Sequence, residues 1–173
     1  VGAIVISAVT LIAWVFHPEG VIVGSMFVLA AIAQLFRLGR WNGHLTLREP
    51  LVAILHVSYL FIPIGFALIA LSLLQPEIFP GAAGIHALGV GAVGTMTLSV
   101  MVRATLGHTG RALKANRYVF FIFGCVILSA MSRIAAAFDT GLVDILLHVA
   151  AFSWLFAFAG FGIAFAPALT RRR

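Results

Sequence analysis

The stretch that decides the fold runs from His86 to Arg111 and reads HALGVGAVGTMTLSVMVRATLGHTGR. From Ile85 to Val102 it contains no Asp, Glu, Lys or Arg, and an uncharged apolar run of that length can cross a membrane as a helix. Small residues recur along one side at helical spacing: Gly84, Ala87, Gly91, Thr95 and Ser99. A stripe of this kind lets a neighbouring helix approach closely. The opposite side carries His86, Val93, Thr97 and Val100. We therefore expect a helix at the centre of a bundle, packed on both sides.

The composition of the whole chain is that of a membrane protein. Of its 173 residues, 62% are hydrophobic and 9% are charged, and the mean hydropathy is +1.15. Soluble domains carry about 25% charged residues, so this chain cannot cover a water-facing surface. The net charge of +6 comes mostly from short segments beside apolar runs, so we expect no nucleic-acid partner. The single cysteine, Cys125, excludes a disulfide framework and a cysteine-rich zinc site.

Hydropathy predicts an all-α, polytopic transmembrane helical bundle of about six spans, forming a single domain over residues 1–173. The predicted spans cover residues 1–16, 21–38, 51–74, 85–106, 118–138 and 143–168. Pro63 is expected to kink the third span. The start of that span has two interpretations, because Thr46 begins a capping-box sequence whereas Pro50 suits a first helical position. The chain lacks an initiator methionine and begins inside an apolar run, which indicates a fragment of a longer protein.

The charges of the connecting loops predict how the bundle is oriented. Basic residues stand in every second loop and at the C-terminus: Arg37, Arg40, Arg48, Arg111, Lys114, Arg117 and Arg171–Arg173. The other loops, 17–20, 75–84 and 139–142, carry Glu19, Glu77 and Asp139 and no Lys or Arg. By the positive-inside rule both termini should be cytoplasmic, so the fourth and sixth spans run inward from the outer face.

This topology sorts the polar residues within the spans into two clusters by depth. At about 1.5 Å per residue, the outer cluster contains His86, Arg133 and His148. The inner cluster contains His56, Arg103 and His108. Two histidines at matched depth on different helices suit bis-imidazole ligation of haem, and imidazole also binds copper. A nearby arginine suits a haem propionate. The candidate haem site is therefore His86, His148, Arg133 and Asp144, and the candidate metal ligands are His86, His148, His56 and His108.

Each candidate also has a purely structural explanation. A histidine can simply bond a carbonyl of a neighbouring helix, and Arg103 can extend to the inner headgroups. Arg133 is harder to explain, because burying a guanidinium at span depth costs at least about 2.5 kcal/mol. Asp144 could pair with Arg133, or it could orient His148 from the preceding helical turn. We favour the outer cluster as the haem site, with the inner cluster as the alternative.

The run from Met101 to Arg111 resembles the signature of the NnrS family. The motif residues are Arg103, Thr105, Gly107, His108, Gly110 and Arg111. Residues 86–88, 91–101 and 46–51, with His56 and Tyr59, also resemble that family, so the resemblance covers about residues 35–115 and the remainder agrees in hydropathy. It implies the C-terminal half of a bacterial inner-membrane protein of about twelve spans, linked to nitric oxide and binding haem and copper. It assigns no ligand residues, so the proposed histidines rest on depth and motif position.

The sequence thus predicts a multi-pass protein of the bacterial inner membrane that responds to nitric oxide, or protects against it, through haem and copper. A metal buried in a bundle would meet a gas that dissolves in lipid. The expected partners are the lipid bilayer, nitric oxide and the N-terminal spans of the same protein. Three alternatives stay open: a redox enzyme subunit, a transporter lined by the His and Arg residues, and a scaffold without a cofactor. A haem absorption spectrum separates the haem-based interpretations from the last two.

Overall fold

The fold was analysed in a computed structural model, which describes residues 1–138 and 141–170, so Asp139 and Arg171–Arg173 of the predicted loops lie outside the described residues. The described chain is helical and contains no strand. Its outer helices are α1 (Gly2–Phe16), α2 (Val21–Gly39), α3 (Pro50–Leu74), α6 (Arg117–Ala135) and α7 (Val143–Thr170). The central span consists of α4 (Gly81–His86), the π-helical segment η2 (Ala87–Gly94) and α5 (Thr95–His108). A short 3-10 turn, η1 (Gly43–Thr46), precedes α3.

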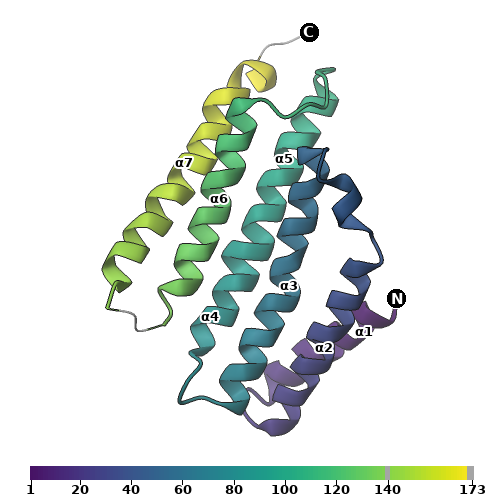
Figure 1. Ribbon diagram of the computed structural model, residues 1–173, viewed down its shortest axis with the longest axis vertical. Coiled ribbons are helices and arrows are strands. Elements are labelled where there is room, and N and C mark those ends of the chain that lie inside the picture. The colour runs from purple at the N-terminus through teal and green to yellow at the C-terminus, as the bar shows by residue number, and fades with distance from the viewer. Residues whose placement is uncertain (139–140, 171–173) are drawn as a thin grey trace.

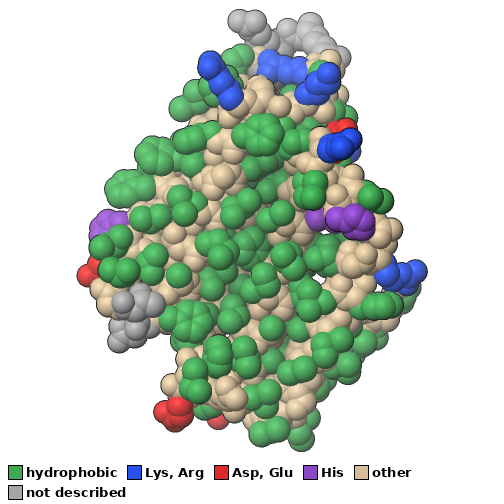
Figure 2. Space-filling view, in the orientation of Figure 1, with side chains coloured by type: hydrophobic (Ala, Val, Ile, Leu, Met, Phe, Trp, Pro, Cys, Tyr) green, Lys and Arg blue, Asp and Glu red, His purple; other side chains and the backbone are tan. Residues whose placement is uncertain are grey.

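The helices stand side by side in chain order, with the central span between α3 and α6 (Figure 1). Five of them are long and apolar enough to cross a membrane, namely α2, α3, the central span, α6 and α7, whereas α1 is apolar but has 15 residues. The predicted all-α membrane bundle is therefore confirmed. The α5–α6 loop and η1 lie toward one end of the bundle, and the α1–α2, α3–α4 and α6–α7 connections lie toward the other. On the face shown in Figure 2, hydrophobic side chains cover the length of the bundle, and most Lys and Arg side chains lie toward the first end.

The structure settles the start of the third predicted span and corrects two other predicted helix boundaries. Helix α3 begins at Pro50, as the proline interpretation requires, while the Thr46 hydroxyl donates to the Gly43 carbonyl at 2.7 Å inside η1 and caps nothing. The central span begins at Gly81, directly after Pro80, and not near residue 85. Helix α6 ends at Ala135 and not at residue 138, because the chain there continues in tight turns.

The small-residue side of the central span packs against α3, as predicted. All five residues of the stripe are buried: Gly84, Ala87, Gly91, Thr95 and Ser99. A Cβ atom on Gly84 would lie 2.9 Å from the carbonyl oxygen of Gly65 on α3, and one on Gly65 would lie 3.2 Å from the carbonyl oxygen of Gly84. The two backbones therefore touch, which only glycine permits at both positions.

The central span is packed on a second side as well, but not on the side opposite the stripe. Helix α6 packs along the central span, and Leu98 and Val102 are fully buried in one apolar cluster with Ile54 of α3 and Ile122 of α6. The line drawn opposite the stripe is open instead, since Val93 is 65% exposed and Val100 is 49% exposed. The expectation that this line packs against protein is wrong for the described chain, because α3 and α6 leave its Val93 and Val100 side chains uncovered.

Candidate functional site

The structure brings together two of the residues predicted to form the outer cluster. His86 is the last residue of α4, is half-buried, and stands directly before the π-helical segment η2. Helix α6 packs against α4 and carries Arg133, whose positive charge lies within electrostatic range of the His86 imidazole. Segments with π-helical hydrogen bonding are frequent at functional sites. His86 and Arg133 therefore stand on two packed helices, at the edge of an irregular part of the central span.

His148 lies on a different face of the bundle. It is exposed on α7, and α6 separates α7 from α4 in the row of helices (Figure 1). The hollow beside the His148 ring is lined by residues of α7 alone, and the ring stacks on Phe152 with centroids 6.5 Å apart. The described residues contain no group of three or more His, Cys, Asp or Glu side chains placed to hold a metal.

Asp144 contacts His148 through its backbone. The Nδ1 atom of His148 lies 2.6 Å from the carbonyl oxygen of Asp144, one helical turn earlier. That contact leaves Nε2 as the outward-facing nitrogen, in the manner of many metal-binding histidines. The Asp144 carboxylate stands in the first turn of α7, where a negative charge stabilises the helix dipole.

Arg133 needs less explanation than its predicted depth implied. Because α6 ends at Ala135, the arginine lies in the last helical turn, and it is half-buried rather than enclosed. A positive charge at a helix C-terminus is stabilised by the helix dipole, by roughly 0.3–1 kcal/mol. The side chain is also long enough to reach the headgroup region from that position. An anionic ligand is therefore compatible with Arg133 but is not required by it.

In the inner cluster, His56 lies beside His44, which was not among the predicted ligands. The His56 ring packs edge-on against Trp41 at 6.0 Å and against the backbone of Gly43, where a Cβ atom would lie 2.7 Å from its Cδ2 atom. His56 and His44 line one cavity of about 310 Å³. The Nδ1 atom of His56 lies 3.1 Å from the Val52 carbonyl oxygen, which leaves Nε2 toward its other neighbours. The sequence gives no reason to place His44 beside His56, because no helical spacing relates η1 to α3.

A buried polar network continues from this corner into the bundle. Trp41 packs on Tyr59 at 4.6 Å, and the Arg37 guanidinium lies over both rings at 5.3 and 5.7 Å. The Tyr59 hydroxyl donates to Gln34 Oε1, and Gln34 Nε2 donates to Ser7 Oγ at 2.6 Å. This network joins α1, α2 and α3. The sequence did not predict it, because Gln34 is the single polar residue in the apolar run 26–36 and gives no sign of which helices it meets.

The motif from Arg103 to Arg111 forms the end of α5 and a helix stop. Gly110 has φ +66°, its N–H donates to the Gly107 carbonyl at 3.2 Å, and the N–H of Arg111 donates to the Leu106 carbonyl at 3.0 Å. These are the two hydrogen bonds of a Schellman motif. The Thr109 hydroxyl donates to the Thr105 carbonyl at 2.7 Å. Much of the motif is thus explained by chain reversal.

The charged residues of the motif end in different places. Arg103 is half-buried and His108 is exposed, both on α5. Arg111 follows the helix stop and lines a cavity between α6 and α7. The structure therefore places His56 beside His44 and not beside these motif residues. The residues of the predicted inner cluster do not line one common site.

These features define a polytopic helical membrane protein with half-buried histidine and arginine side chains near both ends of its spans. The model of the family described as NnrS protein matches residues 2–173, so the chain belongs to the NnrS family. That match extends the resemblance of residues 35–115 over almost the whole chain. No curated protein and no solved structure matches the chain.

Proposed function

We propose that this chain serves the nitric oxide response in the bacterial inner membrane by holding a haem beside the central span. Membership of the NnrS family supports the nitric oxide response. The observation that carries the haem proposal is that His86 ends α4 at the edge of η2 and that α4 packs against α6, the helix that carries Arg133 in its last turn. An imidazole is a good axial ligand for iron, and a guanidinium binds a carboxylate such as a haem propionate.

The residues present fit one side of a haem. Beside His86, the open face of the central span is smooth, since a Cβ atom on Gly89 would meet nothing within 4 Å and Val93 is 65% exposed. A flat apolar ligand can lie against such a face. The described chain does not place His148 beside it, so His148 does not complete a bis-histidine pocket here. We therefore propose that His86 would be the one histidine of this segment that holds the haem iron and that Arg133 would pair with a propionate.

This arrangement gives the protein residues a simple role. When bound, a haem would supply an iron able to bind nitric oxide. His86 would fix the orientation of the group, and Arg133 would neutralise its negative charge at the end of the span. The exposed apolar face would let a lipid-dissolved gas reach the site without passing through water.

Copper is proposed for a separate place, the cavity shared by His44 and His56. Two imidazoles suit copper, and the contact of His56 Nδ1 with the Val52 carbonyl, at 3.1 Å, leaves Nε2 for a ligand. Removing both imidazoles, by His44→Ala with His56→Ala, should lower copper per protein without lowering haem. Metal analysis of the purified full-length protein measures both quantities.

The haem proposal is tested by haem content at equal protein concentration. The full-length protein is purified in detergent, and its Soret absorption is compared with that of His86→Ala, Arg133→Gln, His148→Ala and His56→Ala. We expect the band to be lost in His86→Ala, reduced in Arg133→Gln and kept in the other two. Loss only in His56→Ala would move the site to the inner end, and unchanged haem in all four would remove it from these residues. A parent protein without any Soret band would favour a transporter or a scaffold.

A further inference from the structure

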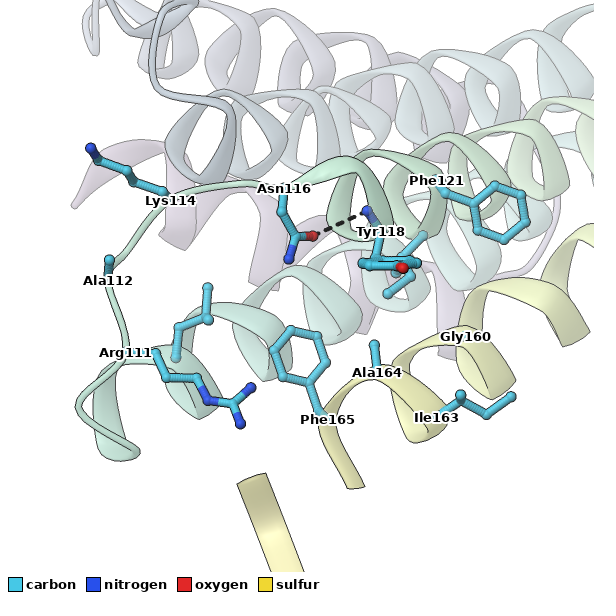
Figure 3. A pocket seen from close by; sticks show the side chains of 12 residues that line it. Arg111, Ala112, Lys114, Asn116, Tyr118, Phe121, Gly160, Ile163, Ala164 and Phe165 are labelled. Atoms are coloured by element: carbon cyan, nitrogen blue, oxygen red, sulfur yellow. Dashed lines mark hydrogen bonds between the residues drawn. The ribbon is translucent and has the colours of Figure 1, made fainter. Parts of the chain in front are cut away.

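A cavity at the basic end of the bundle is separate from both histidine sites. It has a volume of about 700 Å³ and lies where the end of α5, the start of α6 and the end of α7 meet (Figure 3). Its wall has a polar part, with Arg111 and Asn116, and an apolar part, with Ile122, Ile163 and Phe165. A cavity that is basic at one side and apolar at the other fits an amphiphile with a negative headgroup.

The polar part of the wall consists of hydrogen-bond donors and positive charge. The Schellman motif fixes the backbone of Arg111, and Figure 3 shows its guanidinium on the cavity side, near Phe165. Asn116 caps α6 by accepting from the N–H groups of Tyr118 and Val119 at 3.1 Å each, which turns its side-chain nitrogen toward the cavity. The N-terminus of α6 adds partial positive charge. These groups together favour a phosphate.

The apolar part of the wall opens toward the lipid. Ile122 and Phe165 are buried, whereas Phe121 and Ile163 at the rim are 56% and 79% exposed. A small soluble anion would leave these side chains uncovered. An acyl chain would cover them, and it would continue along the apolar surfaces of α6 and α7 in the membrane.

The cavity also lies at the right level for a headgroup. Its basic residues belong to the loop end of the bundle that the positive-inside rule assigns to the cytoplasmic surface. Basic pockets between membrane helices on that side bind anionic lipid headgroups. We propose that this cavity binds an anionic phospholipid, with its phosphate at Arg111 and Asn116 and one acyl chain against Phe121 and Ile163. The chain-reversing end of the motif then serves to position Arg111 for the lipid.

The test uses the delipidated full-length protein in detergent. Its melting temperature is measured with phosphatidylglycerol, with phosphatidylcholine and with glycerol phosphate as the headgroup alone. We expect phosphatidylglycerol to raise the melting temperature by a few degrees and the other two to have little effect. Equal shifts from both lipids would overturn the proposal, and an equal shift from glycerol phosphate would replace the lipid with a soluble anion.

Two pairs of variants assign the effect to the cavity. Arg111→Gln should lose most of the phosphatidylglycerol shift, whereas Arg40→Gln, which alters another basic loop, should keep it. Ala164→Phe fills the cavity and should abolish the shift, while Ala151→Phe, at an exposed position near the other end of α7, should not. A full shift in Arg111→Gln or in Ala164→Phe would contradict the proposal. If Arg111→Gln does not fold, the alanine pair decides the question with Arg111 intact.

Discussion

The two halves of the central span differ in how they are built. The first half, Gly81–Gly94, is rich in glycine, touches the backbone of α3 and changes from α-helical to π-helical hydrogen bonding directly after His86. The second half, Thr95–His108, is a regular helix that buries Leu98 and Val102 between α3 and α6 and ends in a Schellman motif. The first half is less regular as a helix, but it packs closely against the α3 backbone and leaves one polar edge open. The second half fixes where the chain reverses and where Arg111 stands.

The comparison depends first on which half faces which side of the membrane. Because basic loops alternate with loops that lack Lys and Arg, reporter fusions after Arg40 and Lys114 should read cytoplasmic, and a fusion after Glu77 should read periplasmic. The expected signals are all-or-none. A periplasmic signal after Lys114 would mean that the predicted orientation in the membrane is reversed. The lipid cavity would then lie at the periplasmic surface, which contradicts the proposal.

The close packing of the first half can be tested with two of its glycines. Gly84→Leu should destabilise the protein strongly, at the upper end of the roughly 1–3 kcal/mol typical of overpacking, because a Cβ atom there would already lie 2.8 Å from the Ile69 nitrogen. The control is Gly89→Leu, since Gly89 has open space and should tolerate the change. Thermal melting in detergent measures both. If the two variants melt alike, the contact with α3 is not what stabilises this half.

The chain reversal at the end of the second half should show a smaller effect. Gly110→Ala places a side chain at φ +66° and should cost about 1 kcal/mol, because this backbone conformation is unfavourable for residues with a Cβ atom. The matched control is Gly107→Ala, which stands inside the helix with nothing within 4 Å and should be neutral or slightly stabilising. The comparison is again made by thermal melting. If the Gly110→Ala protein is as stable as the parent, the positive φ of Gly110 does not contribute to stability, and this account of the helix end is wrong.

Much of this fold could be predicted from the sequence, because uncharged runs and loop charges are strong signals. The buried stripe from Gly84 to Ser99 was predicted by its spacing alone. The π-helical segment was not, since a spacing of four residues is close to one turn in either kind of helix. Boundaries near Gly81 and Ala135 were missed because apolar residues continue past the ends of the helices.

The candidate site was harder to predict. The sequence indicates how deep a residue lies in the membrane, but it does not indicate which neighbouring helix its side chain faces. His86 and His148 stand at similar distances from the starts of their helices, yet one is half-buried beside α6 and the other is exposed on α7. Helix α7 is apolar on all sides, so no polar stripe in its sequence indicated which face His148 occupies. The partnership of His44 with His56 depends on the path of a loop, which no periodicity encodes.

The most direct measurement of the central claim is the electron paramagnetic resonance spectrum of the ferric protein with and without His86. A haem held by one imidazole should give a high-spin signal, which should vanish in His86→Ala and persist in His148→Ala. A low-spin bis-histidine signal that is lost equally in His86→Ala and His148→Ala would contradict the account. It would mean that the two histidines meet at one iron.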